Sequence, residues 1–138
     1  MGKFGIKKMK HVEKNTKYTE THEWIAVEED VGTVGVTDIA QRELGEVVYV
    51  ELPAIGMQVQ AGQEVAVLES TKAATDIYAP VSGEILQVNA KLKEESSLVN
   101  RNAEREGWLF QIKLKDQNEL KRLMTKKAYL DSLDLLRN

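Results

Sequence analysis

Apolar and polar positions alternate with a period of two over much of the region between residues 21 and 115. This alternation is typical of strands that bury one face and expose the other. The clearest run is GWLFQIKLK, in which Trp108, Phe110, Ile112 and Leu114 occupy every second position. The pattern therefore predicts a mainly β fold, with strands at 23–27, 32–37, 45–50, 62–69, 75–83, 83–88 and 107–115.

Two segments follow a helical period instead. DIAQREL, residues 38–44, predicts a short helix that Asp38 caps and Gly45 ends, with Ile39 and Leu44 facing inward. A longer helix is expected at 117–136. Its apolar stripe consists of Leu120, Leu123, Met124, Leu130, Leu133 and Leu136. We expect this stripe to pack against the β domain, and the alternative is a helix that docks a partner.

A short repeat suggests internal symmetry. GEVVYV at 45–50 and GEILQV at 83–88 match at an offset of 38 residues, and each begins a strand after a glycine turn. Two copies are too few for a solenoid, which needs at least three. The repeat therefore favours a pseudo-twofold β domain, and chance similarity between two strands is the alternative.

Charge divides the chain into a basic N-terminal tail, residues 1–17, and one domain, residues 18–138. The tail has six lysines and one glutamate. Residues 18–90 carry thirteen acidic residues against Arg42 and Lys72 alone, a formal charge of −11. Such a field would attract basic partner surfaces and disfavour nucleic acid. The simpler interpretation is an acidic surface that only aids solubility.

The residues that most enzymes use for catalysis are scarce. The chain has no cysteine, only His11 and His22 as histidines, and no glycine-rich phosphate loop. We therefore expect no metal site and no catalytic centre. No apolar run is long enough to cross a bilayer, and MGKFGIKKMK lacks the apolar segment of a secretory signal. We expect a cytoplasmic protein, or a mitochondrial-matrix protein if the source is eukaryotic.

Lys72 is the single lysine between Tyr18 and Ala90. The segment STKAA joins two predicted strands and places Lys72 near the tip of a hairpin without the Gly or Asn of a primed turn. A Schiff-base lysine would need an apolar pocket, and a phosphate-binding lysine a glycine-rich loop. An exposed lysine on a rigid tip instead suits the attachment of a group carrier such as biotin or lipoamide. The alternative is an ordinary solvated charge.

Four stretches together carry a family resemblance: THEWIAVEED, VGVTDIAQRELGEVVYVELPAIG, VLESTKAATDIYAPVSGEI and GWLFQIKL. In this order, from about Tyr18 to Leu114, they resemble the H protein of the glycine cleavage system. The pattern around Lys72 is specific, because biotinyl domains have Met on both sides of their lysine. The lipoyl domains of oxoacid dehydrogenases usually have Asp where this chain has Thr71.

The resemblance implies a flattened β sandwich, a barrel-sandwich hybrid of two quasi-symmetric halves, with a C-terminal helix. It implies a carrier, not an enzyme, with lipoic acid on Lys72. The implied partners are a pyridoxal-phosphate glycine decarboxylase, a tetrahydrofolate-dependent aminomethyltransferase, the flavin enzyme dihydrolipoamide dehydrogenase, and a lipoate ligase or lipoyl transferase. The loaded arm would fold into a cleft at Thr21, Glu23 and Asp76. Glu69 and Asp76, which flank the tip, are expected to be recognised by the modifying enzyme or the partners.

The chain also departs from the family at Thr71, where Val is usual, and at Ile39, where His is frequent. The segment LKEESSLVNRNAEREGW is more charged than its usual counterpart. These differences keep two alternatives open. One is an H-like protein that donates lipoyl groups to other enzymes. The other is a biotinyl-type carrier or an unmodified binding module.

Overall fold

The structure is a computed structural model that describes residues 15–137, with side chains up to residue 134. Most of the expected basic tail therefore lies outside the described residues. Its predicted end at residue 17 falls inside the first strand, β1 (Thr16–Tyr18). No helix within residues 15–137 is both long and apolar enough to span a membrane.

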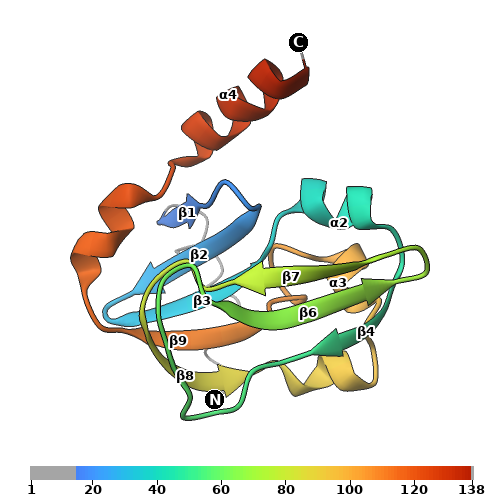
Figure 1. Ribbon diagram of the computed structural model, residues 1–138, viewed down its shortest axis with the longest axis horizontal. Helices are drawn as coiled ribbons and strands as arrows, with labels where there is room; N and C mark the ends of the chain where they lie inside the picture. Colours follow the sequence, from blue (N-terminus) through green and yellow to red (C-terminus); the bar gives the residue numbers. More distant parts are fainter. Residues whose placement is uncertain (1–14, 138) are drawn as a thin grey trace.

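Two antiparallel sheets form the body of the molecule (Figure 1). The larger sheet has the order β1, β2 (Glu23–Glu28), β3 (Val31–Val36), β9 (Phe110–Leu114), β8 (Gly83–Val88) and β5 (Gln58–Val59). The smaller sheet has the order β4 (Val47–Glu51), β6 (Glu64–Ser70) and β7 (Ala74–Tyr78). The mainly β prediction is confirmed, and the two copies of the repeat lie in different sheets, as β4 and β8.

The main core contains side chains from both sheets. Ile25, Val34 and Phe110 come from the larger sheet, and Leu68 and Ile77 come from the smaller one. In β9 the predicted alternation is confirmed, because Phe110, Ile112 and Leu114 are buried whereas Lys113 is exposed. Burial of these apolar faces holds the two sheets together, since each buried aliphatic or aromatic side chain contributes roughly 1.5–3 kcal/mol.

The helix predicted at 38–44 is confirmed as α2 (Asp38–Leu44), but its N-cap lies one residue earlier than predicted. Thr37, not Asp38, is the N-cap, and its hydroxyl accepts a hydrogen bond from the Ala40 N–H at 3.2 Å. Asp38 instead pairs with Arg42 one turn later. Gly45 ends the helix with φ +92°, as predicted, because glycine adopts this backbone conformation without a steric penalty. Leu44 and Ile39 are both half-buried, and Leu44 packs against the main core.

The prediction of a C-terminal helix is confirmed, but the prediction of one continuous helix over 117–136 is wrong. Two helices replace it, the 3-10 helix η3 (Gln117–Arg122) and α4 (Lys126–Arg137). They are separated because Met124 pairs with Tyr18 as in a strand, through two backbone hydrogen bonds of 2.8 Å each. Two further short helices, η2 (Ala90–Lys93) and α3 (Leu98–Arg101), lie in the connection between β8 and β9.

The predicted apolar stripe divides between two clusters. Leu120 and Leu123 pack on the main core. Met124 and Leu133 pack on a second cluster, formed by the buried residues Tyr18, Trp24, Ala26 and Tyr129. Leu130 is exposed, and the side chain of Leu136 lies outside the described residues. The residue that anchors α4 is therefore Tyr129, which the stripe did not include.

Candidate functional site

Lys72 lies at the tip of the β6–β7 hairpin and is exposed. The tip is closed by the Ser70 N–H, which donates to the Ala73 carbonyl at 2.7 Å. The Ser70 hydroxyl oxygen accepts from the N–H groups of Lys72 and Ala73, at 3.1 and 3.0 Å. Neither Thr71 nor Lys72 has a positive φ, so the turn is not one of the primed types, as its composition predicted. A serine side chain thus holds the backbone beneath an accessible lysine.

The tip also rests on the segment that follows α2. The Thr71 N–H donates to the Glu46 carbonyl at 3.1 Å. A Cβ atom placed on Gly45 would lie 3.2 Å from Cε of Lys72 and 3.9 Å from its Nζ. The lysine side chain therefore passes over Gly45, where the missing side chain leaves it space.

A cleft of about 330 Å³ lies beside this glycine. Residues of α2, including Glu43 and Leu44, line one wall, and residues of β7, including Asp76, line the other. Thr21 and His22 also line the cleft. Apolar side chains complete the lining, among them Val36, Leu68 and Ile77. The cleft therefore combines an apolar interior with two carboxylates and the hydroxyls of Thr21 and Thr75.

Glu23 is fully buried, with no exposed surface. One carboxylate oxygen accepts from the hydroxyls of Thr19 and Thr21, at 2.5 and 2.6 Å. The other accepts from the Tyr78 N–H at 3.0 Å. Burial raises the pKa of the Glu23 carboxyl, and the hydrogen bonds from Thr19, Thr21 and Tyr78 oppose that rise. Both oxygens of the Glu23 carboxylate thus accept hydrogen bonds from groups of the protein itself.

The structure brings together part of the expected site. Thr21 and Asp76 line the cleft, both exposed, close to the hairpin that carries Lys72. Glu23 lies behind the cleft rather than in it, because its oxygens face Thr19, Thr21 and Tyr78. Glu69 is exposed on β6, paired with Ala74 across the hairpin, and is not among the cleft residues.

Among the titratable residues that line the cleft, His22 and Glu43 were not predicted from the sequence. Glu43 lies three residues after Ala40, so the helical period puts both on the same face of α2. That spacing could have identified Glu43 once Ala40 was assigned to the cleft. No local signal identifies His22, because its place depends on contacts with residues far along the chain.

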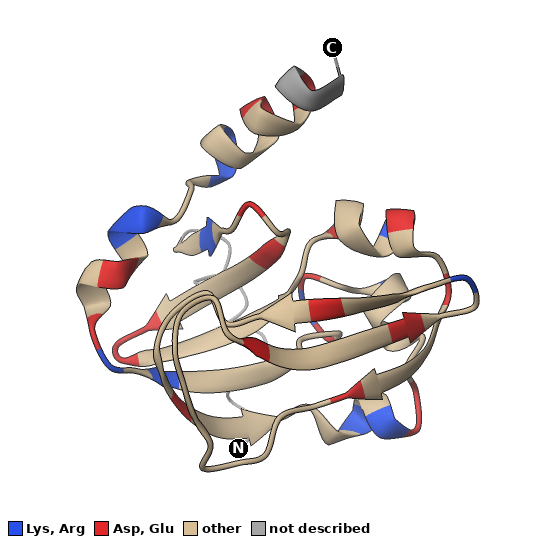
Figure 2. Ribbon diagram, in the orientation of Figure 1, with Lys and Arg blue, Asp and Glu red and all other residues tan. Residues whose placement is uncertain are grey.

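Acidic residues lie on the elements next to the hairpin tip that carries Lys72. Figure 2 shows acidic segments on α2, β4, β6 and β7, and a basic segment at the hairpin tip. Among the residues of the structure that can be described, no group of three or more His, Asp or Glu side chains could hold a metal ion. The arrangement instead suits a covalent arm. An acyl chain on Lys72 could cross Gly45 and lie along the apolar interior, with a cationic end group near Asp76 and Glu43.

Comparison with known proteins gives consistent matches. The family model described as "Glycine cleavage H-protein" matches residues 16–134. The glycine cleavage system H protein of Thermotoga maritima is 52% identical over 116 residues, which is 84% of this chain and 94% of that protein. The protein of the same name from Beijerinckia indica is 54% identical over 121 residues, 88% of this chain and 98% of that protein.

A solved structure matches as well. The crystal structure of a glycine cleavage system H protein from Mycobacterium marinum is similar with a TM-score of 0.81 at 31% sequence identity. The match covers 87% of this chain and 97% of that one. The family match includes the hairpin, the cleft residues and α4 up to residue 134.

Proposed function

This chain belongs to the glycine cleavage H-protein family, and we propose that it carries the aminomethyl group of glycine on a lipoyl arm attached to Lys72. An H protein is a carrier component of the glycine cleavage system and is not itself an enzyme. The observation that supports Lys72 is its exposure on a hydrogen-bonded hairpin tip, beside a cleft that its side chain can reach over Gly45. When bound, the lipoyl group supplies the disulfide that accepts the aminomethyl group.

The partners follow from this role. Family membership implies partners within the glycine cleavage system. Specifically, we propose the decarboxylase as donor of the aminomethyl group and the folate-dependent aminomethyltransferase as its acceptor. Dihydrolipoamide dehydrogenase would reoxidise the arm, and a lipoate ligase or lipoyl transferase would attach it. Because relatives such as the Thermotoga maritima protein are bacterial, we propose that these encounters take place in the cytoplasm.

The cleft would shelter the loaded arm. An aminomethyl group on sulfur is a protonated amine at neutral pH, and Asp76 and the Thr21 hydroxyl can accept hydrogen bonds from it. Glu23 would act through Thr21, because it accepts the hydrogen of the Thr21 hydroxyl and so leaves the Thr21 oxygen directed at the amine. Exclusion of water matters because hydrolysis of the aminomethyl thioether consumes one water and releases formaldehyde, ammonia and the thiol.

Glu69 would serve recognition. It is exposed on the strand that leads to Lys72 and takes no part in lining the cleft. An exposed carboxylate contributes little to folding stability. If Glu69 is recognised by the modifying enzyme or the partners, Glu69→Ala should slow lipoylation or arm oxidation. Because the carboxylate is exposed, the substitution should not lower the stability of the protein.

The rate of formaldehyde release tests whether the cleft shelters the loaded arm from water. The lipoylated protein is incubated with glycine and the decarboxylase, which loads the arm, and is then separated from the enzyme. The rate at which it releases formaldehyde is then measured. Asp76→Ala should release formaldehyde about tenfold faster than the wild type, the change expected for loss of about 1.4 kcal/mol. Glu64→Ala, which removes an exposed carboxylate at the far end of β6, is the matched control and should behave as the wild type.

Equal release from all variants would mean that these residues do not shelter the arm. If the lipoylated wild type takes up no aminomethyl group at all, the carrier role in glycine cleavage fails, and a lipoyl donor for other enzymes becomes the better account.

A further inference from the structure

Tyr129 on α4 makes two hydrogen bonds through one hydroxyl. Its oxygen lies 2.7 Å from Nδ1 of His22 and 2.8 Å from Oγ1 of Thr37. A hydroxyl can donate one hydrogen bond and accept another, so both can form together. Burial raises the pKa of the Tyr129 hydroxyl, which therefore keeps its proton at neutral pH. The ring is buried and stacks on Tyr18, with centroids 4.9 Å apart and planes inclined by 12°.

One of the two partners, Thr37, sets the start of α2. Its hydroxyl accepts from the Ala40 N–H at 3.2 Å, and its carbonyl accepts from the Gln41 N–H at 3.2 Å. Ala40 and Glu43 on this helix line the arm cleft. A bond that holds the Thr37 side chain therefore fixes where one wall of the cleft begins.

The other partner, His22, belongs to the cleft lining. It has φ +73°, a left-handed conformation that a residue with a Cβ adopts only at a cost. Its carbonyl accepts from the Thr37 N–H at 3.0 Å, and its ring meets Tyr129 edge-on at 5.7 Å. The neighbouring residue is Thr21, whose hydroxyl also lies in the cleft. Contacts that hold His22 in this conformation therefore also direct Thr21.

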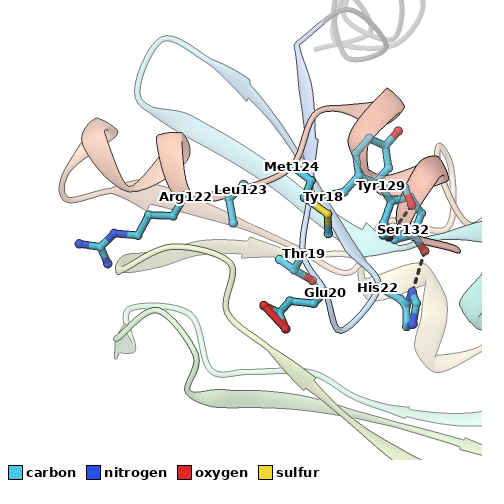
Figure 3. Close-up of a pocket in the computed structure, with 9 residues that line it drawn as sticks. All are labelled: Tyr18, Thr19, Glu20, His22, Arg122, Leu123, Met124, Tyr129 and Ser132. Atoms are coloured by element: carbon cyan, nitrogen blue, oxygen red, sulfur yellow. Dashed lines mark hydrogen bonds between the residues drawn. The ribbon is translucent and has the colours of Figure 1, made fainter. Parts of the chain in front are cut away.

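Figure 3 shows His22 and Tyr129 among the side chains that line a second groove, of about 560 Å³, between β1 and the C-terminal segment. His22 lines both this groove and the arm cleft, and Tyr129 lines the groove. Through the Tyr129 hydroxyl, the C-terminal helix thus contacts His22 of the arm cleft and the N-cap residue Thr37, which are 107 and 92 residues away in sequence.

We propose that Tyr129 is a positioning residue for the arm cleft, whose hydroxyl holds the His22–Thr21 segment and the start of α2 at the spacing that encloses the loaded amine. This inference rests on the proposed carrier function and extends it, because it makes the closure of the cleft depend on the docking of α4. Tyr129 itself is not among the residues that line the arm cleft.

The experiment compares three lipoylated full-length variants with the wild type. Tyr129→Phe removes the shared hydroxyl and keeps the ring stacked on Tyr18. Tyr18→Phe is the matched control, since it removes a hydroxyl from the same aromatic cluster but not the one bonded to His22 and Thr37. Thr37→Ser keeps the hydroxyl that Tyr129 needs. All are loaded as described above and followed for formaldehyde release.

Tyr129→Phe should release formaldehyde about threefold to tenfold faster than the wild type, whereas Tyr18→Phe and Thr37→Ser should match it. In ¹⁵N NMR spectra of Tyr129→Phe, the His22 ring nitrogens should shift and the Ala40 amide should exchange faster with solvent. Lipoylation of Lys72 should proceed at the wild-type rate, because the hairpin tip makes none of these contacts.

Two other outcomes would overturn the proposal. In the first, Tyr129→Phe shows altered His22 resonances but releases formaldehyde as slowly as the wild type, which would make Tyr129 only an anchor for α4. In the second, Tyr18→Phe accelerates release equally, which would assign the effect to general loosening of the aromatic cluster. If the wild type took up no aminomethyl group, the proposed carrier function would be wrong. This outcome is distinct from the two that would refute the positioning role of Tyr129.

Discussion

At the scale of single residues, Glu23 is the one residue with an ionisable carboxyl that is buried within the described part of the chain. Its carboxylate has no exposed surface and accepts from two hydroxyls and one backbone N–H. A buried charge is costly unless it is well hydrogen-bonded. The three donors offset part of that cost, and the pKa of Glu23 remains raised because burial has the larger effect. The residue therefore acts as a buried support for Thr21 and β7.

This environment predicts how stability depends on pH. Because the pKa of Glu23 is higher in the folded than in the unfolded protein, the folded state binds more protons between the ordinary value, 4.5, and the raised one. The free energy of unfolding should therefore fall as pH rises through this window, by about 1.4 kcal/mol for each unit of the rise. Glu23→Gln lacks this titration, so its stability relative to the wild type should improve with pH.

Urea denaturation at several pH values, from about pH 4 to about pH 7.5, measures the difference in the free energy of unfolding between Glu23→Gln and the wild type. If this difference stays constant, or if Glu23→Gln becomes less stable relative to the wild type as pH rises, the pKa of Glu23 is not raised in the folded state.

Glu23 also shows what sequence reasoning could not reach at this scale. The family resemblance placed Glu23 in the arm cleft with Thr21 and Asp76, but its carboxylate is buried and accepts from the Tyr78 N–H, 55 residues away. Lys72 was different, because its exposure follows from a turn whose residues are adjacent in sequence. The exposure of Lys72 was therefore predictable from neighbouring residues, whereas the burial of Glu23 was not, because it depends on residues far away in sequence.

At the scale of elements, the β6–β7 hairpin holds the backbone around Lys72. Ser70 supplies a side-chain acceptor for two backbone N–H groups of the tip. Ser70→Ala should leave those N–H groups to water, with a loss of at most about 1.5 kcal/mol of stability. Because a modifying enzyme must read the shape of the tip, kcat/KM for lipoylation should fall several-fold.

The control for this change is Thr71→Ala, which alters a neighbouring side chain but keeps the Ser70 hydroxyl. Hydrogen exchange of the Lys72 amide should be faster in Ser70→Ala than in Thr71→Ala. Wild-type lipoylation kinetics in Ser70→Ala would refute a role for tip rigidity in recognition.

The strands were predictable at the element scale because a period of two appears within a few residues. β2 and β3 lie within one residue of their predicted bounds, and β9 lies within three residues of its predicted bounds. The C-terminal helix was not predicted correctly, because its break at Met124 depends on pairing with Tyr18, far away in sequence. The cap of α2 was missed by one residue, because both Thr37 and Asp38 are good N-cap residues.

At the scale of the whole molecule, acidic groups dominate the body that carries Lys72. The formal charge of −11 over residues 18–90 should attract basic surfaces on partner enzymes before contact. Raising the ionic strength from about 20 mM to about 300 mM should therefore lower kcat/KM for arm oxidation by dihydrolipoamide dehydrogenase several-fold, because salt screens long-range attraction. The effect on kcat should be smaller, since bound partners are already in contact.

Glu69→Ala should weaken this salt dependence, and Glu64→Ala, at the far end of the same strand, should weaken it less. A kcat/KM that does not respond to salt would mean that the acidic surface serves solubility alone, the simpler interpretation that the sequence left open.

The central claim is that Lys72 alone receives the lipoyl group, and intact mass spectrometry tests it most directly. After incubation with lipoic acid, ATP and a lipoate ligase, the wild type should gain the mass of one lipoyl group, and peptide mapping should locate it on Lys72. Lys72→Arg keeps the positive charge but should gain nothing, whereas Lys91→Arg, which alters an exposed lysine elsewhere, should be modified as the wild type. A lipoyl group on Lys72→Arg, or a wild type that gains no group, would contradict the account.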